Sequence, residues 1–232
     1  FYGGRSWAVE LARKGFAVLV TDVFLFGSRK IYIESLNCSD SDDCVRKYNV
    51  ISKDIENYAA KILTAIGLNV IGMIIYEDLV SLEYLSRRPE VDRSRIGVCG
   101  ASLGGLRAML LSALDERIRC TILVASMSTL DEIVEKGIEH AWTLYIPGVA
   151  KYFDFPDIAA IHMPNPILIQ YCEEDRIFPY SGQIKADEKL MKMYQKAGYP
   201  QNYHRVFYKK PHIFDVEMQE YAFRWLKDCL SN

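Results

Sequence analysis

A candidate nucleophile stands in the stretch Gly100-Ala101-Ser102-Leu103-Gly104, a G-x-S-x-G sequence. The apolar run 96–99 precedes it and predicts a buried strand, and a mostly apolar helical pattern follows it. A strand, a tight turn and a helix around this sequence are typical of a nucleophile elbow. We expect that Cβ atoms at positions 100 and 104 would collide with neighbouring backbone, which accounts for both glycines. The alternative is a glycine-rich turn with an idle serine, and we favour Ser102 as nucleophile.

A serine hydroxyl needs a base within hydrogen-bond reach, and histidine is the usual one. In nucleophile-elbow enzymes the order is serine, acid and histidine, each in a loop after a strand. His212 alone follows the last predicted strand and precedes the last helix. His204 begins that strand, and His162 precedes a strand, so both belong to the wrong edge of the sheet. His212 is therefore the predicted base, with an ordinary surface loop histidine as the alternative.

The acid that orients the imidazole must come from the loop before this one. Asp175 follows the predicted strand 166–171 and heads the sequence Asp-Arg-Ile-Phe-Pro. Glu173 and Glu174 lie nearer the strand end and remain rivals. We favour Asp175, and a solvated acidic turn is the alternative without catalysis.

Alternating apolar patterns predict the elements that position these residues. They favour an α/β fold with a mostly parallel sheet and helices on both faces. Strands are predicted at residues 16–20, 96–99, 119–125, 166–171 and 203–208. Helices are predicted at residues 7–14, 51–68, 73–86, 106–114, 181–198 and 214–230, and a polar loop at 24–50.

Residues 126–163 are irregular, aromatic and proline-bearing, and we expect this insertion to roof the site. Trp142, Tyr145 and His140 within it are the candidate substrate-binding residues. The alternative is ordinary packing of one more helix pair, and for His140 a structural role is the favoured alternative.

Composition narrows the class of protein. The 232 residues carry a net charge of −2, which gives no electrostatic reason to expect nucleic acid or an anionic membrane as partner. No apolar run approaches the ~18 residues of a membrane span. Residues 1–4 lack the basic region and apolar core of a signal peptide, and a cytoplasmic location is expected.

The six cysteines are scattered along the chain. Cys99, Cys120, Cys172 and Cys229 stand in apolar patterns, so buried free thiols are favoured. Cys38 and Cys44 flank an acidic stretch that could close as a disulfide or attract a cation. A solvated acidic loop is the favoured interpretation there.

Ser102, Asp175 and His212 in these contexts resemble the α/β-hydrolase superfamily, and more closely its dienelactone-hydrolase-like and acetyl-xylan-esterase-like branch. The resemblance covers nearly the whole chain. It rests on residues 10–16 leading to Asp22, 84–92, 113–118, 146–148, 155–160, 164–168, 211–214 and 218–219.

The resemblance implies a serine ester hydrolase acting on a small-molecule carboxylic ester, with acetylated sugars as one substrate class. It implies that the backbone N–H of Leu103 helps to hold the oxyanion, and it implies no metal and no organic cofactor. A homo-oligomer stays open. The alternatives are a prolyl-oligopeptidase-type peptidase and a non-catalytic hydrolase-fold binding protein.

Two departures from the family matter. Relatives carry a His-Gly-rich segment that donates the second half of the oxyanion hole, and a strand between those equivalent to residues 16–22 and 96–99. Neither is present, so we expect residues 1–232 to be a single α/β-hydrolase domain that lacks its N-terminal strands. The second departure is Leu25, which stands where relatives usually have glycine and would reshape the rim of the site.

Overall fold

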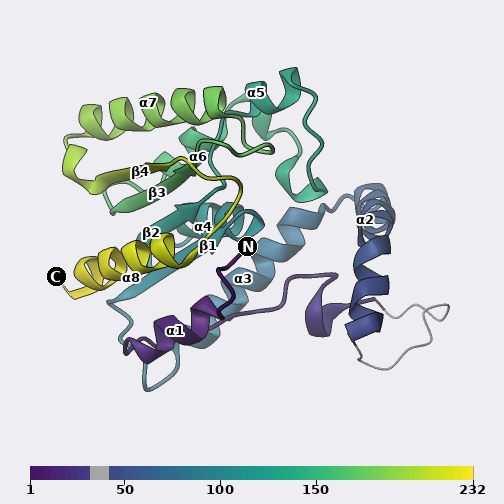
Figure 1. Cartoon of the computed structure of the whole chain (residues 1–232), viewed down its shortest axis with the longest axis horizontal. Coiled ribbons are helices and arrows are strands. Elements are labelled where there is room, and N and C mark those ends of the chain that lie inside the picture. Colours follow the sequence, from purple (N-terminus) through teal and green to yellow (C-terminus); the bar gives the residue numbers. More distant parts are fainter. Residues whose placement is uncertain (32–41, 232) are drawn as a thin grey trace.

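Four parallel strands form the centre of the computed structural model, which describes residues 1–31 and 42–231. Each strand pairs in parallel with the next, so the carboxyl ends of all four lie at one edge of the sheet (Figure 1). In sheet order they are β1 (Ile96–Ala101), β2 (Ile118–Val124), β3 (Ile167–Cys172) and β4 (Tyr203–Tyr208).

Helices cover both faces of the sheet, as the alternating pattern predicted. Because successive side chains of a strand point to opposite faces, Ile122 and Val124 of β2 pack with one helix layer and Leu123 with the other. Figure 1 shows α7 and α8 on opposite sides of the strands. One layer holds α1 (Trp7–Arg13) and α8 (Val216–Ser231); the other holds α3 (Val70–Ser86), α4 (Leu103–Leu114), α6 (Phe155–Ala160) and α7 (Tyr180–Ala197).

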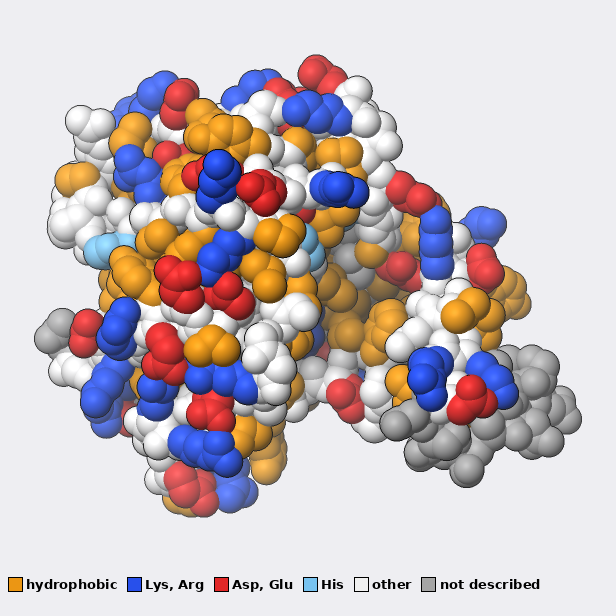
Figure 2. All heavy atoms as spheres, in the orientation of Figure 1, with side chains coloured by type: hydrophobic (Ala, Val, Ile, Leu, Met, Phe, Trp, Pro, Cys, Tyr) orange, Lys and Arg blue, Asp and Glu red, His pale blue; other side chains and the backbone are white. Residues whose placement is uncertain are grey.

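Helix α2 (Asp42–Ala65) projects away from the sheet and meets α3 at 90°. Figure 2 shows a hollow between this arm and the rest of the protein, with hydrophobic side chains on its walls. Among the described residues, no single helix is long and apolar enough to cross a membrane, and only the bent pair of α2 and α3, counted together, reaches that threshold. The short elements are η1 (Gly27–Arg29), α5 (Leu130–Glu135), η3 (Trp142–Leu144), η4 (Val149–Lys151) and η5 (Pro200–Asn202).

The prediction of a strand at residues 16–20 is wrong. This segment forms no strand, and the side chains of Leu19 and Val20 are 39% and 66% exposed. A cavity of about 620 Å³ separates it from β1, whose only strand partner among the described residues is β2. A strand exists only where its N–H and C=O groups meet those of a neighbour, and here no neighbour stands beside the segment.

An ion pair on the wall of the same cavity holds this segment in place. Arg107 of α4 donates to both carboxylate oxygens of Asp78 in α3, at 2.9 and 2.5 Å. The Nη2 atom that donates to Asp78 Oδ1 also donates to the Thr21 hydroxyl at 3.0 Å. The segment is therefore anchored by side chains rather than by a strand ladder.

The prediction of a loop at residues 24–50 is wrong for its last nine residues, because α2 already begins at Asp42. Tyr48 on this extra helical stretch is buried, and its hydroxyl donates to the Leu25 carbonyl at 2.6 Å. Leu25 is itself buried and has a φ of 78°, in the left-handed region that favours glycine. The backbone at this position thus explains why glycine would be the easier residue to place there.

The cysteine predictions are partly confirmed. Four cysteines are free thiols, as expected. Cys120 and Cys172 are buried, and Cys99 and Cys229 are partly buried. Cys44 is disulfide-bonded, and Cys38 and residues 39–41 of the acidic stretch lie outside the described residues.

Candidate active site

Ser102 occupies the sharp turn between β1 and α4, as predicted. Its backbone has φ 55° and ψ −123°, a conformation that non-glycine residues rarely adopt and that costs of order 1–3 kcal/mol. The Ser102 N–H donates to the Val124 carbonyl at 2.9 Å, which holds the strained residue against the neighbouring strand. The turn therefore directs the serine out of the strand, at the carboxyl edge of the sheet.

The expected backbone collision is confirmed at one of the two glycines of the motif and not at the other. A Cβ at Gly100 would lie 1.9 Å from the Gly104 carbonyl oxygen, so this glycine is required by close backbone approach. The expectation for Gly104 itself is wrong, because a Cβ there would meet nothing within 4 Å. Instead Gly105 is the crowded position, where a Cβ would lie 2.0 Å from the Ser126 hydroxyl oxygen.

The start of α4 lies directly behind Ser102. Leu103 is the first residue of this helix, and the first N–H groups of an α-helix have no acceptor inside it. Helix N-termini favour negative charge for this reason and through the aligned peptide dipoles. The Leu103 N–H is thus available to an anion beside the Ser102 hydroxyl.

Asp175 and His212 are in direct contact after β3 and β4. The Nδ1 atom of His212 lies 2.6 Å from Oδ2 of Asp175, whose carboxylate is fully buried. The other oxygen, Oδ1, accepts the N–H groups of Ile177 at 2.9 Å and Phe178 at 3.2 Å. A carboxylate accepts and does not donate, so the ring carries its proton on Nδ1 and leaves Nε2 as the free acceptor.

The rival acids do not reach the histidine. The N–H of Glu173 donates to the Tyr208 carbonyl at 2.9 Å, and that of Glu174 donates to the Lys210 carbonyl at 3.0 Å. These bonds continue the pairing of the two loops and leave the side chain of Glu174 exposed. Among the described residues, neither glutamate forms a hydrogen bond or ion pair with His212.

The Ser102 hydroxyl is not hydrogen-bonded to the Asp175–His212 pair. Among the described residues, the Ser102 hydroxyl forms no hydrogen bond, and it lines the cavity beside β1. Catalytic hydrogen bonds in unliganded proteins are often open and close only with substrate bound. All three side chains nevertheless follow carboxyl ends of parallel strands, so they share one edge of the sheet.

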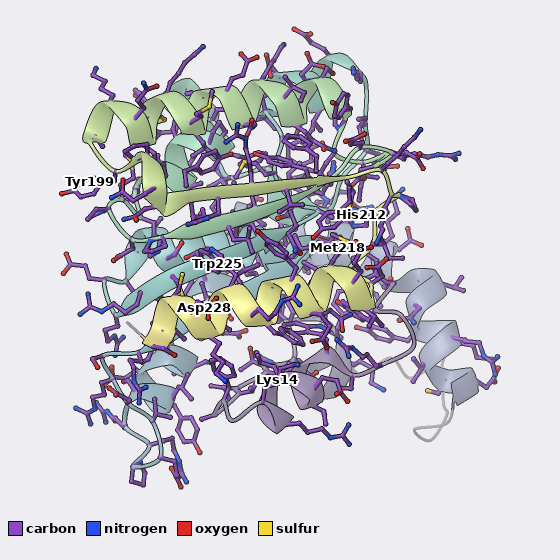
Figure 3. The ribbon with its side chains drawn as sticks, turned by 60° about the vertical axis from the view of Figure 1, so that its left-hand side comes forward. Lys14, Tyr199, His212, Met218, Trp225 and Asp228 are labelled. Atoms are coloured by element: carbon purple, nitrogen blue, oxygen red, sulfur yellow. The ribbon has the colours of Figure 1, made fainter. Side chains whose placement is uncertain are left out.

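The other histidines lie where the sequence placed them. His204 packs edge-on against Trp225 at 5.5 Å, and Figure 3 shows Trp225 along α8 and His212 beyond the start of that helix. His162 is buried beneath α6, where burial lowers its pKa to about 4. Neither is near the Asp175–His212 pair.

The predicted substrate-binding residues lie in residues 126–163, which are called the roof here after their predicted role. The Trp142 backbone N–H donates to Glu56 at 3.0 Å and its indole N–H to Asn57 at 2.5 Å, so α2 holds this tryptophan. Trp142 and Tyr145 are 41% and 40% exposed, which leaves both available for further contact. Contact of these residues with a substrate stays a prediction.

Two aromatic rings against His212 were not predicted. The Phe178 ring stacks on the imidazole with ring centres 6.0 Å apart, and the Phe1 ring lies 5.2 Å away. Phe178 follows Asp175 by three residues, so the motif itself could have suggested it. Phe1 is far away in sequence and gave no signal. Among the described residues, no three His, Cys, Asp or Glu side chains are grouped to hold a metal ion.

The parallel sheet, the strained serine turn and the order of the three loops define an α/β-hydrolase fold. Residues 7–228 match the sequence model of the Abhydrolase family. The chain belongs to this family. A Bacillus subtilis (strain 168) protein named "Putative hydrolase YtaP" is 30% identical over 227 residues, covering 97% of this chain and 69% of that protein.

Solved structures share the fold. A "putative acetyl xylan esterase" from Bacteroides fragilis NCTC 9343 aligns with a TM-score of 0.67 and 20% identity, over 87% of this chain and 49% of that one. A glucuronoyl esterase from Caldicellulosiruptor kristjansonii aligns with a TM-score of 0.58 and 17% identity, over 70% and 50%. The chain spans about half the length of these two structures.

Proposed function

We propose that this protein is a serine hydrolase of carboxylic esters, with Ser102 as nucleophile, His212 as base and Asp175 as the acid that orients it. The observation that carries the proposal is the 2.6 Å contact between His212 Nδ1 and a fully buried Asp175 carboxylate. A surface histidine has no need of such a partner, and the contact leaves Nε2 free for a proton from Ser102.

In the proposed reaction, His212 Nε2 takes the hydroxyl proton as Ser102 Oγ attacks the ester carbonyl carbon. Asp175 stabilises the imidazolium that results, because its carboxylate lies against the ring nitrogen that stays protonated. The tetrahedral intermediate collapses, the C–O bond to the alcohol breaks, and His212 returns the proton to the leaving oxygen. Water then cleaves the acyl-enzyme by the same steps.

The oxyanion of the intermediate forms beside the first turn of α4. We assign the Leu103 N–H as one donor, since it is the first helical N–H after the serine and has no acceptor inside the helix. Loss of one such donor typically costs about 10²–10³ in rate.

Support for a substrate class comes from the solved structures that share the fold. The solved structures with this fold include proteins named as an acetyl xylan esterase and a glucuronoyl esterase. We therefore propose an ester of a carbohydrate, with acetylated sugars as the first class to assay. Trp142 and Tyr145 are the candidate substrate contacts in the roof, whereas the hydrogen bond of His140 to the Ile177 carbonyl favours a structural role for this third candidate.

Labelling with a fluorophosphonate probe tests the nucleophile without knowledge of the substrate. The probe reacts only with an activated serine, so we expect one labelled site at Ser102. His212→Ala should abolish labelling, whereas the matched control His204→Ala at the other end of β4 should label as the parent does. Absence of labelling in the parent protein would favour a non-catalytic binding protein, and cleavage of peptides in preference to esters would favour a peptidase.

A further inference from the structure

His140 comes from the roof but makes its hydrogen bond with the loop that carries Asp175. Its Nε2 atom lies 2.7 Å from the Ile177 carbonyl oxygen, which can only accept, so the ring donates from Nε2. The ring also lies against Phe178, with centres 5.0 Å apart. One side chain of the roof thus contacts two successive residues of the acid loop, defined here as residues 175–179.

The same two residues fix the orientation of the acid. The N–H groups of Ile177 and Phe178 both donate to Asp175 Oδ1, which turns Oδ2 toward His212. The Phe178 ring then stacks on the imidazole of His212 at an interplanar angle of 18°. Any shift of the peptide between Ile177 and Phe178 would therefore move both the carboxylate and the ring that supports the base.

The acid loop has a second, independent anchor. Gln183 of α7 is buried and donates to the carbonyl groups of Cys172 and Phe178, each at 2.7 Å. The loop is thus held from the helix side by Gln183 and from the roof side by His140. Removal of His140 alone should leave the loop folded and loosen only its roof side.

We propose that His140 is a positioning residue that holds the acid loop so that Asp175 and His212 keep the geometry needed for proton transfer. The proposal rests on the proposed function, since it deepens the role of the same site. The titratable groups that face His140 are Asp175 and His212, and Glu139 beside it is paired with Lys53. Burial lowers the pKa of His140, so it stays neutral and does not oppose the positive charge that forms on His212.

Two substitutions separate the hydrogen bond from packing. His140→Phe keeps a ring against Phe178 but has no donor for the Ile177 carbonyl. His140→Gln places an amide N–H2 near the position of Nε2 and should restore the bond. We expect His140→Phe to lower kcat on the order of tenfold with KM nearly unchanged, and His140→Gln to recover most of that loss.

The pH dependence gives a readout that a merely structural role would not move. With Asp175 less well aligned, the imidazolium of His212 is less stabilised, so the acidic limb of kcat/KM should shift to lower pH in His140→Phe. The chain has only four histidines, so their imidazole resonances can be followed directly by NMR. The His212 titration should move in the same direction in His140→Phe and return in His140→Gln, while His204→Phe leaves it unchanged.

The outcomes are distinct. Unchanged kcat, pH profile and His212 titration in His140→Phe would overturn the positioning role, as would a His140→Gln variant no better than His140→Phe. If Ser102→Ala kept full esterase activity, the proposed function would fail instead. The NMR titration needs no activity, so it decides the contact between the roof and the acid loop in either case.

Discussion

The Asp175 carboxylate contacts His212 at 2.6 Å although the two residues come from separate loops after β3 and β4. Its second oxygen is already occupied by two backbone N–H groups of its own loop. The orientation of the carboxylate is therefore fixed by its own loop, and the carboxylate can hold the imidazole in only one orientation.

The acid can be tested by removing its charge. Asp175→Asn keeps the shape but presents an amide that cannot stabilise the imidazolium, so kcat should fall on the order of 10⁴ while the protein stays folded. Glu174→Gln is the matched control and should change kcat little, because that side chain is exposed and does not contact His212. A crippled Glu174→Gln with a mild Asp175→Asn would show that the acid is misassigned.

The roof should influence which esters are cleaved. Trp142 is fixed by α2 through two hydrogen bonds and keeps 41% of its surface exposed. We expect Trp142→Ala and Tyr145→Ala to change the relative kcat/KM among esters of different chain length more than they change Tm. A large loss of Tm with unchanged relative kcat/KM values would instead mean that these residues only pack the roof.

His162 should make the fold sensitive to acid. One ring nitrogen of His162 is hydrogen-bonded to the Ser112 backbone, and Nε2 has no hydrogen-bond partner in the part of the chain that the structure describes. Burial lowers the pKa of His162 to about 4 from an ordinary value of 6.5. The unfolded chain thus binds the proton more readily between these pH values, so stability is present above pH 6.5 and is lost as pH falls toward 4. The loss is at most about 3 kcal/mol, since one pKa unit corresponds to about 1.4 kcal/mol.

Urea unfolding from pH 7 to 4 measures this loss. His162→Gln cannot titrate, so its free energy of unfolding should fall less steeply over that range than that of the parent. Parallel slopes for the two proteins would contradict the assignment. The other two histidines with lowered pKa, His140 and His204, remain in both proteins and cancel in the comparison.

The open edge of β1 should make the chain associate. Its strand N–H and C=O groups face the cavity beside residues 19–23 and can pair with another chain. We expect concentration-dependent association in analytical ultracentrifugation, reduced by Val20→Lys, which places a charge at the exposed wall of the cavity. Val50→Lys is the control, an exposed apolar position on α2. A parent chain that stays monomeric at every concentration would contradict this prediction.

Local patterns predicted where Ser102, Asp175 and His212 lie, because each of them stands in a loop that follows a predicted strand. The bounds of β4 agree with the sequence pattern, and the strand before Ser102 extends only two residues further. Because the strands are parallel, the loops that follow them lie at one edge of the sheet, so their proximity could be predicted from the sequence pattern alone. The carboxylate of Asp175 was separable from Glu173 and Glu174 only by its contact with His212, which the sequence does not contain.

Other features depend on partners that a local pattern cannot reveal. The run at residues 16–20 has the composition of a strand, but composition reports a tendency to be buried and not whether a neighbour exists. Gly104 matched the motif, yet Gly105 is the crowded position, because Ser126 approaches it from the segment that follows β2. The bond between His140 and Ile177 likewise joins residues 37 positions apart and follows from the packing of the roof.

The role of Ser102 as nucleophile is tested by measuring the steady-state hydrolysis of p-nitrophenyl acetate by Ser102→Ala and by the parent protein. Ser52→Ala, on exposed α2, is the matched control, and circular dichroism checks that both variants are folded. Ser102→Ala should lower kcat on the order of 10⁴–10⁶, and Ser52→Ala should retain the parent rate. A folded Ser102→Ala protein that hydrolyses the ester at the parent rate would contradict the account.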